Sequence, residues 1–90
     1  MSDDEADIWP VLLSEIVGGT LSDPDVSPAL FSVVVALTVA LCENPWLEGS
    51  NSLEDDPDWR EILIPAGHGI AEYRVNRVDH EVILTRIVIF

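Results

Sequence analysis

Apolar residues recur at helical spacing in the first part of the chain. After Asp7 they follow at i, i+4 and i+8 in two adjacent series: Ile8, Leu12 and Ile16, then Trp9, Leu13 and Val17. Asp7 is a suitable N-cap, and Pro10 falls in the first turn, where its missing N–H has no intrahelical partner. Gly18-Gly19 ends the pattern, and Asp23-Pro24 marks a turn within residues 20–26. The sequence therefore predicts a short first helix and a linker.

A second and longer apolar stretch runs from residue 28 to residue 43. Ser27 and Pro28 supply an N-cap and a proline at the first helical position. Five valines or threonines lower its helix propensity, so a strand is the competing interpretation. Its length of 16 residues and the stop signal Asn44-Pro45 favour a helix.

The pattern changes after residue 58. Residues 44–58 are rich in Gly, Ser, Pro and acidic side chains, which predicts an exposed acidic loop. Three β-type runs follow at 60–64, 70–75 and 81–90, separated by short turns, and predict an antiparallel meander. In the last run Ile83, Ile87 and Ile89 alternate with Val82, Leu84, Val88 and Phe90. Both faces of this strand are apolar, so the helices are expected to cover one face and a partner or a second copy the other.

Length and charge narrow the class of protein. A chain of 90 residues is sufficient for one domain, expected to span residues 1–90 behind a flexible acidic leader at 1–6. It carries 17 acidic and 4 basic side chains, for a net charge of -13, and this disfavours general nucleic-acid binding. Residues 1–58 hold 13 acids and no base. This asymmetry fits either a solubilising surface or a surface that docks a basic partner.

Location and cofactors are constrained by what the sequence lacks. The acidic N-terminus does not resemble a signal peptide, and the apolar run 29–42 is shorter than a bilayer span, so we expect a cytoplasmic protein without a membrane contact. The single cysteine, Cys42, has no disulfide partner, and no Cys/His spacing fits a zinc site. We expect no metal and no cofactor.

One group of polar residues offers candidate chemistry. Glu72 and Arg74 share a face of the second predicted strand with Ile70, and His68 lies in the turn before it. Together His68, Glu72 and Arg74 form a candidate acid/base cluster. The simpler interpretation, an ion pair on a solvated sheet face, is the more common one.

Several short motifs point to a family. Asn44-Pro45 at a helix end, Trp59-Arg60-Glu61-Ile62, Tyr73-Arg74-Val75 and Leu84-Thr85-Arg86-Ile87 follow one another in order. Over residues 28–90 the chain resembles the RelE/ParE superfamily of toxins from type II toxin–antitoxin systems. The resemblance implies an α+β fold in which two N-terminal helices pack on a three-stranded antiparallel sheet, or four-stranded with an added edge strand. It also implies a cognate antitoxin that wraps the toxin, and it makes Arg60, Tyr73, Arg74 and Arg86 candidate site residues.

The departures from the family pattern shape the functional hypothesis. The resemblance implies that mRNA-cleaving members use several Lys and Arg residues on the open sheet face and a residue in a tail after the last strand. This chain has no lysine, has Gly69-Ile70 and Glu72 on the second strand, and has no residue after Phe90. We therefore expect a divergent toxin that acts through protein contacts rather than RNA cleavage. The alternatives are an active ribosome-dependent mRNA endoribonuclease and an acidic orphan module that mimics nucleic acid.

The N-terminal segment is short for this family, whose members begin with an edge strand before two long helices. The expectation is that this strand is missing. The alternative is that Ile8 to Leu13 forms it, in which case Pro10 confines it to an edge.

Overall fold

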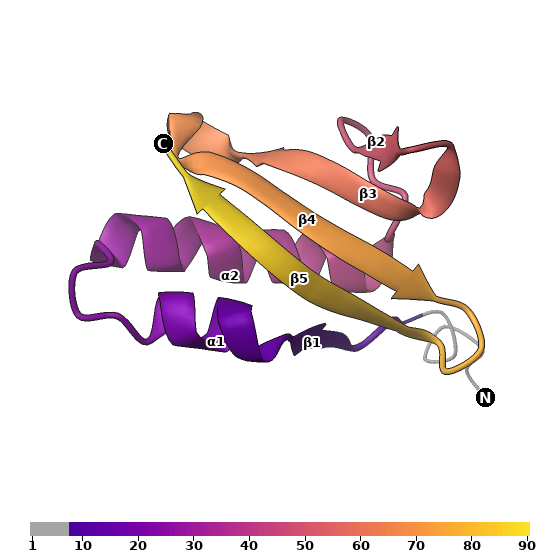
Figure 1. The fold of residues 1–90 in the computed structure, drawn as a ribbon, viewed down its shortest axis with the longest axis horizontal. Coiled ribbons are helices and arrows are strands. Elements are labelled where there is room, and N and C mark those ends of the chain that lie inside the picture. The colour runs from indigo at the N-terminus through magenta and orange to yellow at the C-terminus, as the bar shows by residue number, and fades with distance from the viewer. Residues whose placement is uncertain (1–7) are drawn as a thin grey trace.

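The computed structural model describes residues 8–90, and it places two helices on one face of a five-stranded sheet (Figure 1). The elements, in chain order, are β1 (Val11–Leu13), α1 (Glu15–Leu21), α2 (Pro28–Glu43), β2 (Asn51–Leu53), β3 (Asp56–Ile64), the short 3-10 helix η2 (Pro65–Gly67), β4 (Gly69–Asn76) and β5 (Glu81–Ile89). The predicted α+β class with two N-terminal helices is confirmed. The predicted leader at 1–6 lies outside the described residues.

The sheet is mixed and has the strand order β1-β5-β4-β3-β2. β3, β4 and β5 form the predicted antiparallel meander. Two strands flank it: β2 pairs antiparallel with β3, and β1 pairs parallel with β5. The sheet therefore has five strands where three or four were expected.

The N-terminal segment differs most from its prediction. Residues 8–13 are not helical, because Val11–Leu13 extends along the free edge of β5 and satisfies its backbone groups there. Pro10 lies just before the strand, and its carbonyl accepts a hydrogen bond of 2.8 Å from the Val82 N–H. Helix α1 begins only at Glu15, capped by the Ser14 side chain, and continues through Gly18 and Gly19. The edge strand that was expected to be missing is present.

The predicted loop at residues 44–58 is partly strand. β2 and the first residues of β3 form a narrow hairpin within it, with Glu54 and Asp55 at positive φ in the turn. Acidic and polar residues are compatible with strands here because this hairpin is at the edge of the sheet and largely exposed. Helix α2 spans the residues predicted for it, with Ser27 as N-cap.

A bulge in β5 changes which side chains of that strand face the helices. The pairing of β4 with β5 shifts between Glu72 and Tyr73, so Thr85 is an extra residue on β5. Val82 and Leu84 before the bulge are fully buried, and Ile87 after it packs against the same core. The strict alternation predicted from the sequence is therefore wrong beyond Leu84. Val88, opposite Ile70, lies on the open face.

The core lies between the sheet and the helices. It is made of aliphatic residues and one tyrosine: Val17, Leu30, Val34, Leu37, Leu41, Ile62, Ile64, Ala71, Tyr73, Val75, Val82 and Leu84. The other face of the sheet has no covering layer among residues 8–90 (Figure 1). This uncovered surface is called the open face below.

Candidate functional site

The strand register arranges the open face in three rows that run across the strands. An apolar row contains Leu63, Ile70 and Val88. A charged row contains Glu61, Glu72 and Arg86, with Asn51 at its edge. A mixed row contains Trp59, Arg74, Ile83 and Leu12. Neighbouring rows are two residues apart along β3 and β4, about 7 Å, whereas on β5 the bulge at Thr85 separates Ile83 from Arg86 by three residues.

The charged row holds two glutamates directly opposite each other on neighbouring strands. Glu61 on β3 is directly opposite Glu72 on β4, and Glu72 is opposite Arg86 on β5. Arg86 Nη1 lies 3.7 Å from Glu72 Oε2, an ion pair too long for a hydrogen bond. Among the described residues Glu61 has no cation within ion-pairing distance. Glu72 therefore pairs with Arg86 across the strands and Arg74 pairs with Asp56, which leaves Glu61 without an ion pair.

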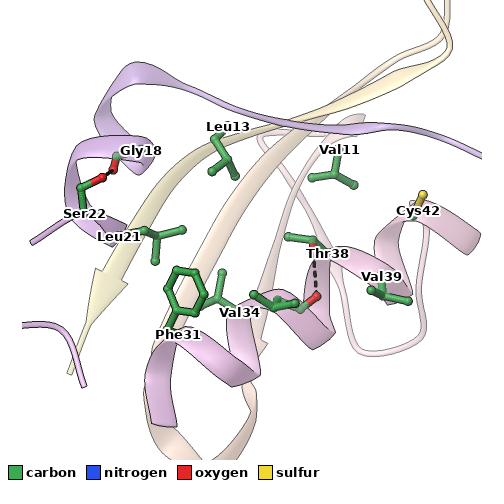
Figure 2. A pocket seen from close by; sticks show the side chains of 11 residues that line it. Val11, Leu13, Gly18, Leu21, Ser22, Phe31, Val34, Thr38, Val39 and Cys42 are labelled. Atoms are coloured by element: carbon green, nitrogen blue, oxygen red, sulfur yellow. Dashed lines mark hydrogen bonds between the residues drawn. The ribbon is translucent and has the colours of Figure 1, made fainter. Parts of the chain in front are cut away.

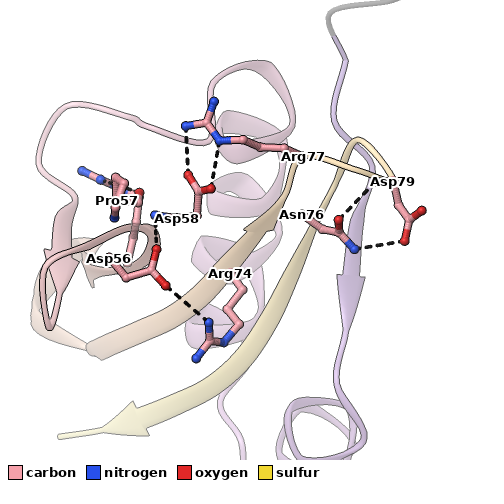
Figure 3. Close-up of polar contacts among 8 residues, drawn as sticks. Asp56, Pro57, Asp58, Arg74, Asn76, Arg77 and Asp79 are labelled. Atoms are coloured by element: carbon pink, nitrogen blue, oxygen red, sulfur yellow. Dashed lines mark hydrogen bonds and ion pairs between the residues drawn. The ribbon is translucent and has the colours of Figure 1, made fainter.

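Arg74 is held at the other end of the open face. Its Nη1 lies 3.7 Å from Asp56 Oδ2 (Figure 3). Its guanidinium is 4.7 Å from the centre of the Trp59 ring. The Arg74 side chain remains about half exposed. Arg74 and Arg86 are thus the two cations that this face presents to solvent.

Arg60 is used inside the edge hairpin. Its guanidinium donates hydrogen bonds of 2.9 Å to Ser50 Oγ, 2.9 Å to the Pro57 carbonyl and 3.1 Å to the Ser50 carbonyl. All three acceptors are neutral, so this candidate site residue makes no ion pair among the described residues. With its donors committed to the loop, Arg60 anchors this hairpin.

Arg77 forms the tightest ion pair of the described chain. It donates to both oxygens of Asp58, at 2.8 and 3.0 Å (Figure 3). Its guanidinium also stacks on the Trp46 ring. These hydrogen bonds hold the pKa of the Asp58 carboxyl below its usual range, and the same contact raises the pKa of Arg77. The pair joins the β4–β5 turn to the start of β3.

Two candidates from the sequence lie away from the open face. Tyr73 points into the core, where it is fully buried and donates a hydrogen bond of 2.7 Å to the Pro45 carbonyl. His68 precedes β4 and is about 13 Å along the strand from Glu72. The acid/base cluster of His68, Glu72 and Arg74 is therefore not assembled. Among the described residues no group of His, Cys, Asp and Glu is placed to hold a metal ion.

A second surface was not anticipated from the sequence. An apolar groove of about 510 Å³ runs between β1 and α1 on one side and α2 on the other (Figure 2). Phe31, Val35 and Val39 line it from α2 at four-residue spacing, and all three remain about half exposed. Leu13 and Leu21 face them from the other side. The signal in the sequence was that α2 is apolar all round, which a helix with a single buried face does not require.

Aromatic side chains from three separate segments of the chain pack against one another. Trp9 stacks on His80 at 3.8 Å between ring centres and meets Trp46 edge to face at 5.3 Å. Trp9 and Trp46 therefore act as anchors within the fold. No helix within residues 8–90 is long and apolar enough to cross a bilayer.

Comparison with known proteins supports the fold. No protein-family model and no curated sequence matches this chain. The structure is similar to that of the isolated RelE toxin of E. coli, with a TM-score of 0.75 and 16% identity, over 90% of this chain and 83% of that one. It is also similar to a RelE arginine-to-alanine mutant in complex with a peptide of the antitoxin RelB, with a TM-score of 0.69 and 17% identity, over 89% and 81% of the two chains. The chain therefore has the fold of RelE, as its motifs suggested.

Proposed function

We propose that this chain is a divergent RelE-like toxin of a type II toxin–antitoxin system, and that it acts in the cytoplasm through protein contacts rather than by cleaving mRNA. The fold supports the first half of this proposal. The second half rests on one observation above all, the direct opposition of Glu61 and Glu72 on the open face. Carboxylates at that position repel a phosphate backbone, and the chain has no lysine to offset them.

The groove between α1 and α2 is the surface best suited to an antitoxin. The RelE mutant with a similar structure is bound to an antitoxin peptide. Here the groove offers an apolar stripe on α2 that matches the i, i+4, i+8 anchors of an amphipathic helix. Its lining is apolar apart from a few small polar side chains, so an apolar segment of the partner would bury its surface there.

Co-expression tests the proposed partnership. The chain is induced in a bacterial host with and without the product of the neighbouring reading frame. We expect growth to slow with the chain alone and to recover when the neighbour is co-expressed. Val39→Asp, in the groove, should prevent recovery and co-purification, because it places a charge where an apolar segment docks. Val78→Asp is the matched control, since Val78 is 94% exposed in the β4–β5 turn. No effect on growth, or equal effects of both variants, would contradict the proposal.

The alternative of an active endoribonuclease retains one supporting feature. Arg74 and Arg86 are both more than half exposed on the open face. Each already has a carboxylate partner, Asp56 or Glu72, which reduces the positive potential it can offer a phosphate.

A further inference from the structure

The open face combines an exposed apolar row with a charged row that holds two carboxylates and one arginine. Leu63 is 65% exposed, and Ile70 and Val88 lie next to it across β4 and β5. Phe90, 72% exposed, follows at the end of β5, where its N–H donates to the His68 carbonyl. A contiguous apolar strip of this kind on a sheet face is typical of a contact surface.

The charged row beside this strip is unfavourable in the isolated chain. Like charges directly opposite each other on neighbouring strands destabilise a sheet. Glu72 has a loose ion pair with Arg86, whereas Glu61 has no cation within ion-pairing distance among the described residues. A cation placed between the two carboxylates would remove the repulsion and balance the charge of the row.

The chemistry of the face selects among three kinds of occupant. An RNA backbone would bring phosphates against Glu61 and Glu72. A second copy would bring another net charge of -13 and could supply only arginines, which the structure shows already engaged. A basic protein segment with apolar side chains complements both rows.

We propose that the open face binds a basic, partly apolar segment of another protein, with a Lys or Arg side chain between Glu61 and Glu72 and apolar side chains on Leu63, Ile70 and Val88. This inference rests on the proposed function in one respect, that the chain acts through protein contacts. It concerns a different surface from the groove between α1 and α2, so the two sites can be occupied together.

Peptide binding to the purified chain tests this inference directly. The probe is a short fluorescent peptide in which leucine and lysine alternate, and binding is followed by anisotropy at about 0.15 M salt. Peptides that alternate leucine with glutamate or serine with lysine are the comparison probes. We expect binding of the leucine–lysine peptide only, because both the charge and the apolar side chains are needed.

Variants locate the site. Glu61→Gln should weaken binding about tenfold, the effect of losing one charge-assisted hydrogen bond, and Leu63→Ser should weaken it as well. Glu48→Gln is the matched control, because it removes the same charge from an exposed turn and should leave affinity unchanged. Glu61→Gln should also raise the melting temperature of the free chain by relieving the repulsion from Glu72.

Four results would overturn the inference: no binding of the leucine–lysine peptide, an equal loss with Glu48→Gln, binding of a short RNA oligonucleotide that Glu61→Gln strengthens, or a dimer in sedimentation that Leu63→Ser dissociates. These outcomes are independent of toxicity. If growth is unaffected by the chain while the peptide still binds at Glu61, the toxin assignment fails and the docking surface stands. If growth slows and the peptide does not bind, the toxin assignment stands and the docking surface fails.

Discussion

Tyr73 on β4 and Pro45 after α2 are 28 positions apart in sequence and are joined by a fully buried hydrogen bond of 2.7 Å from the Tyr73 hydroxyl to the Pro45 carbonyl. This bond links the end of the helical layer to the centre of the sheet. Tyr73 therefore belongs to the scaffold that holds the groove and the open face on opposite sides of the sheet, although its motif made it a candidate site residue.

Tyr73→Phe should lower the free energy of unfolding by about 1 to 2 kcal/mol, because the buried Pro45 carbonyl loses its donor while the ring still fills its space. Urea denaturation measures this change. Thr38→Val is a suitable control, since the Thr38 hydroxyl bonds to the Val35 carbonyl in an exposed position and its removal should cost little. An unchanged midpoint for Tyr73→Phe would show that the bond adds nothing.

Gly69→Ala should destabilise the fold by several kcal/mol. Gly69 begins β4 at a φ of +155°, and a Cβ there would overlap the backbone carbonyl oxygen of Val88. The matched variant is Gly19→Ala, because Gly19 lies within α1 with open space around it. That substitution should stabilise the chain by about 0.5 to 1 kcal/mol through helix propensity. Thermal or urea unfolding of both variants measures these changes in stability. Equal effects of the two substitutions would contradict this account of Gly69.

The Asp58–Arg77 pair should make stability depend on pH. The hydrogen bonds from Arg77 lower the pKa of Asp58 in the folded state, so the pair contributes stability above the usual Asp pKa and loses it as the pH falls through the lowered value. Arg77→Gln should therefore be less stable than wild type at neutral pH, and the difference should shrink below about pH 4. Urea midpoints at several pH values measure it. A constant difference across the range would rule out this linkage.

Added salt should stabilise the protein. The 13 acids in residues 1–58 repel one another, and that repulsion is screened above about 0.1 M salt. The three ion pairs of the described residues all have exposed members, so weakening them costs little. The melting temperature should rise between about 20 mM and about 500 mM sodium chloride. A fall would mean that specific cationic contacts organise the acids.

The sequence was sufficient to predict the larger elements and insufficient for the contacts that place them. Pro28–Glu43 has a clear cap and stop, and the meander has clear turns. Val11–Leu13 could not be separated from a helix by spacing, because a three-residue strand is defined by its partner on β5 and not by its own pattern.

The candidate site was predictable only in part, because it too depends on how one strand pairs with the next. The shared face of Ile70, Glu72 and Arg74 follows from alternation along one strand. The opposition of Glu61 and Glu72 depends on the β3–β4 register, and the position of Val88 depends on the bulge at Thr85. Neither the register nor the bulge has a signature in the residues themselves.

The central claim, that this RelE-like chain does not cleave mRNA, is tested most directly by incubating it with programmed ribosomes at low salt and mapping cuts in the message. A toxin known to cleave mRNA on the ribosome is the positive control. We predict no cuts from the wild type, because Glu61 and Glu72 oppose a phosphate backbone on the open face. Specific cuts that disappear in Arg74→Ala or Arg86→Ala, but persist in the control Arg77→Ala, would contradict the claim and establish a nuclease.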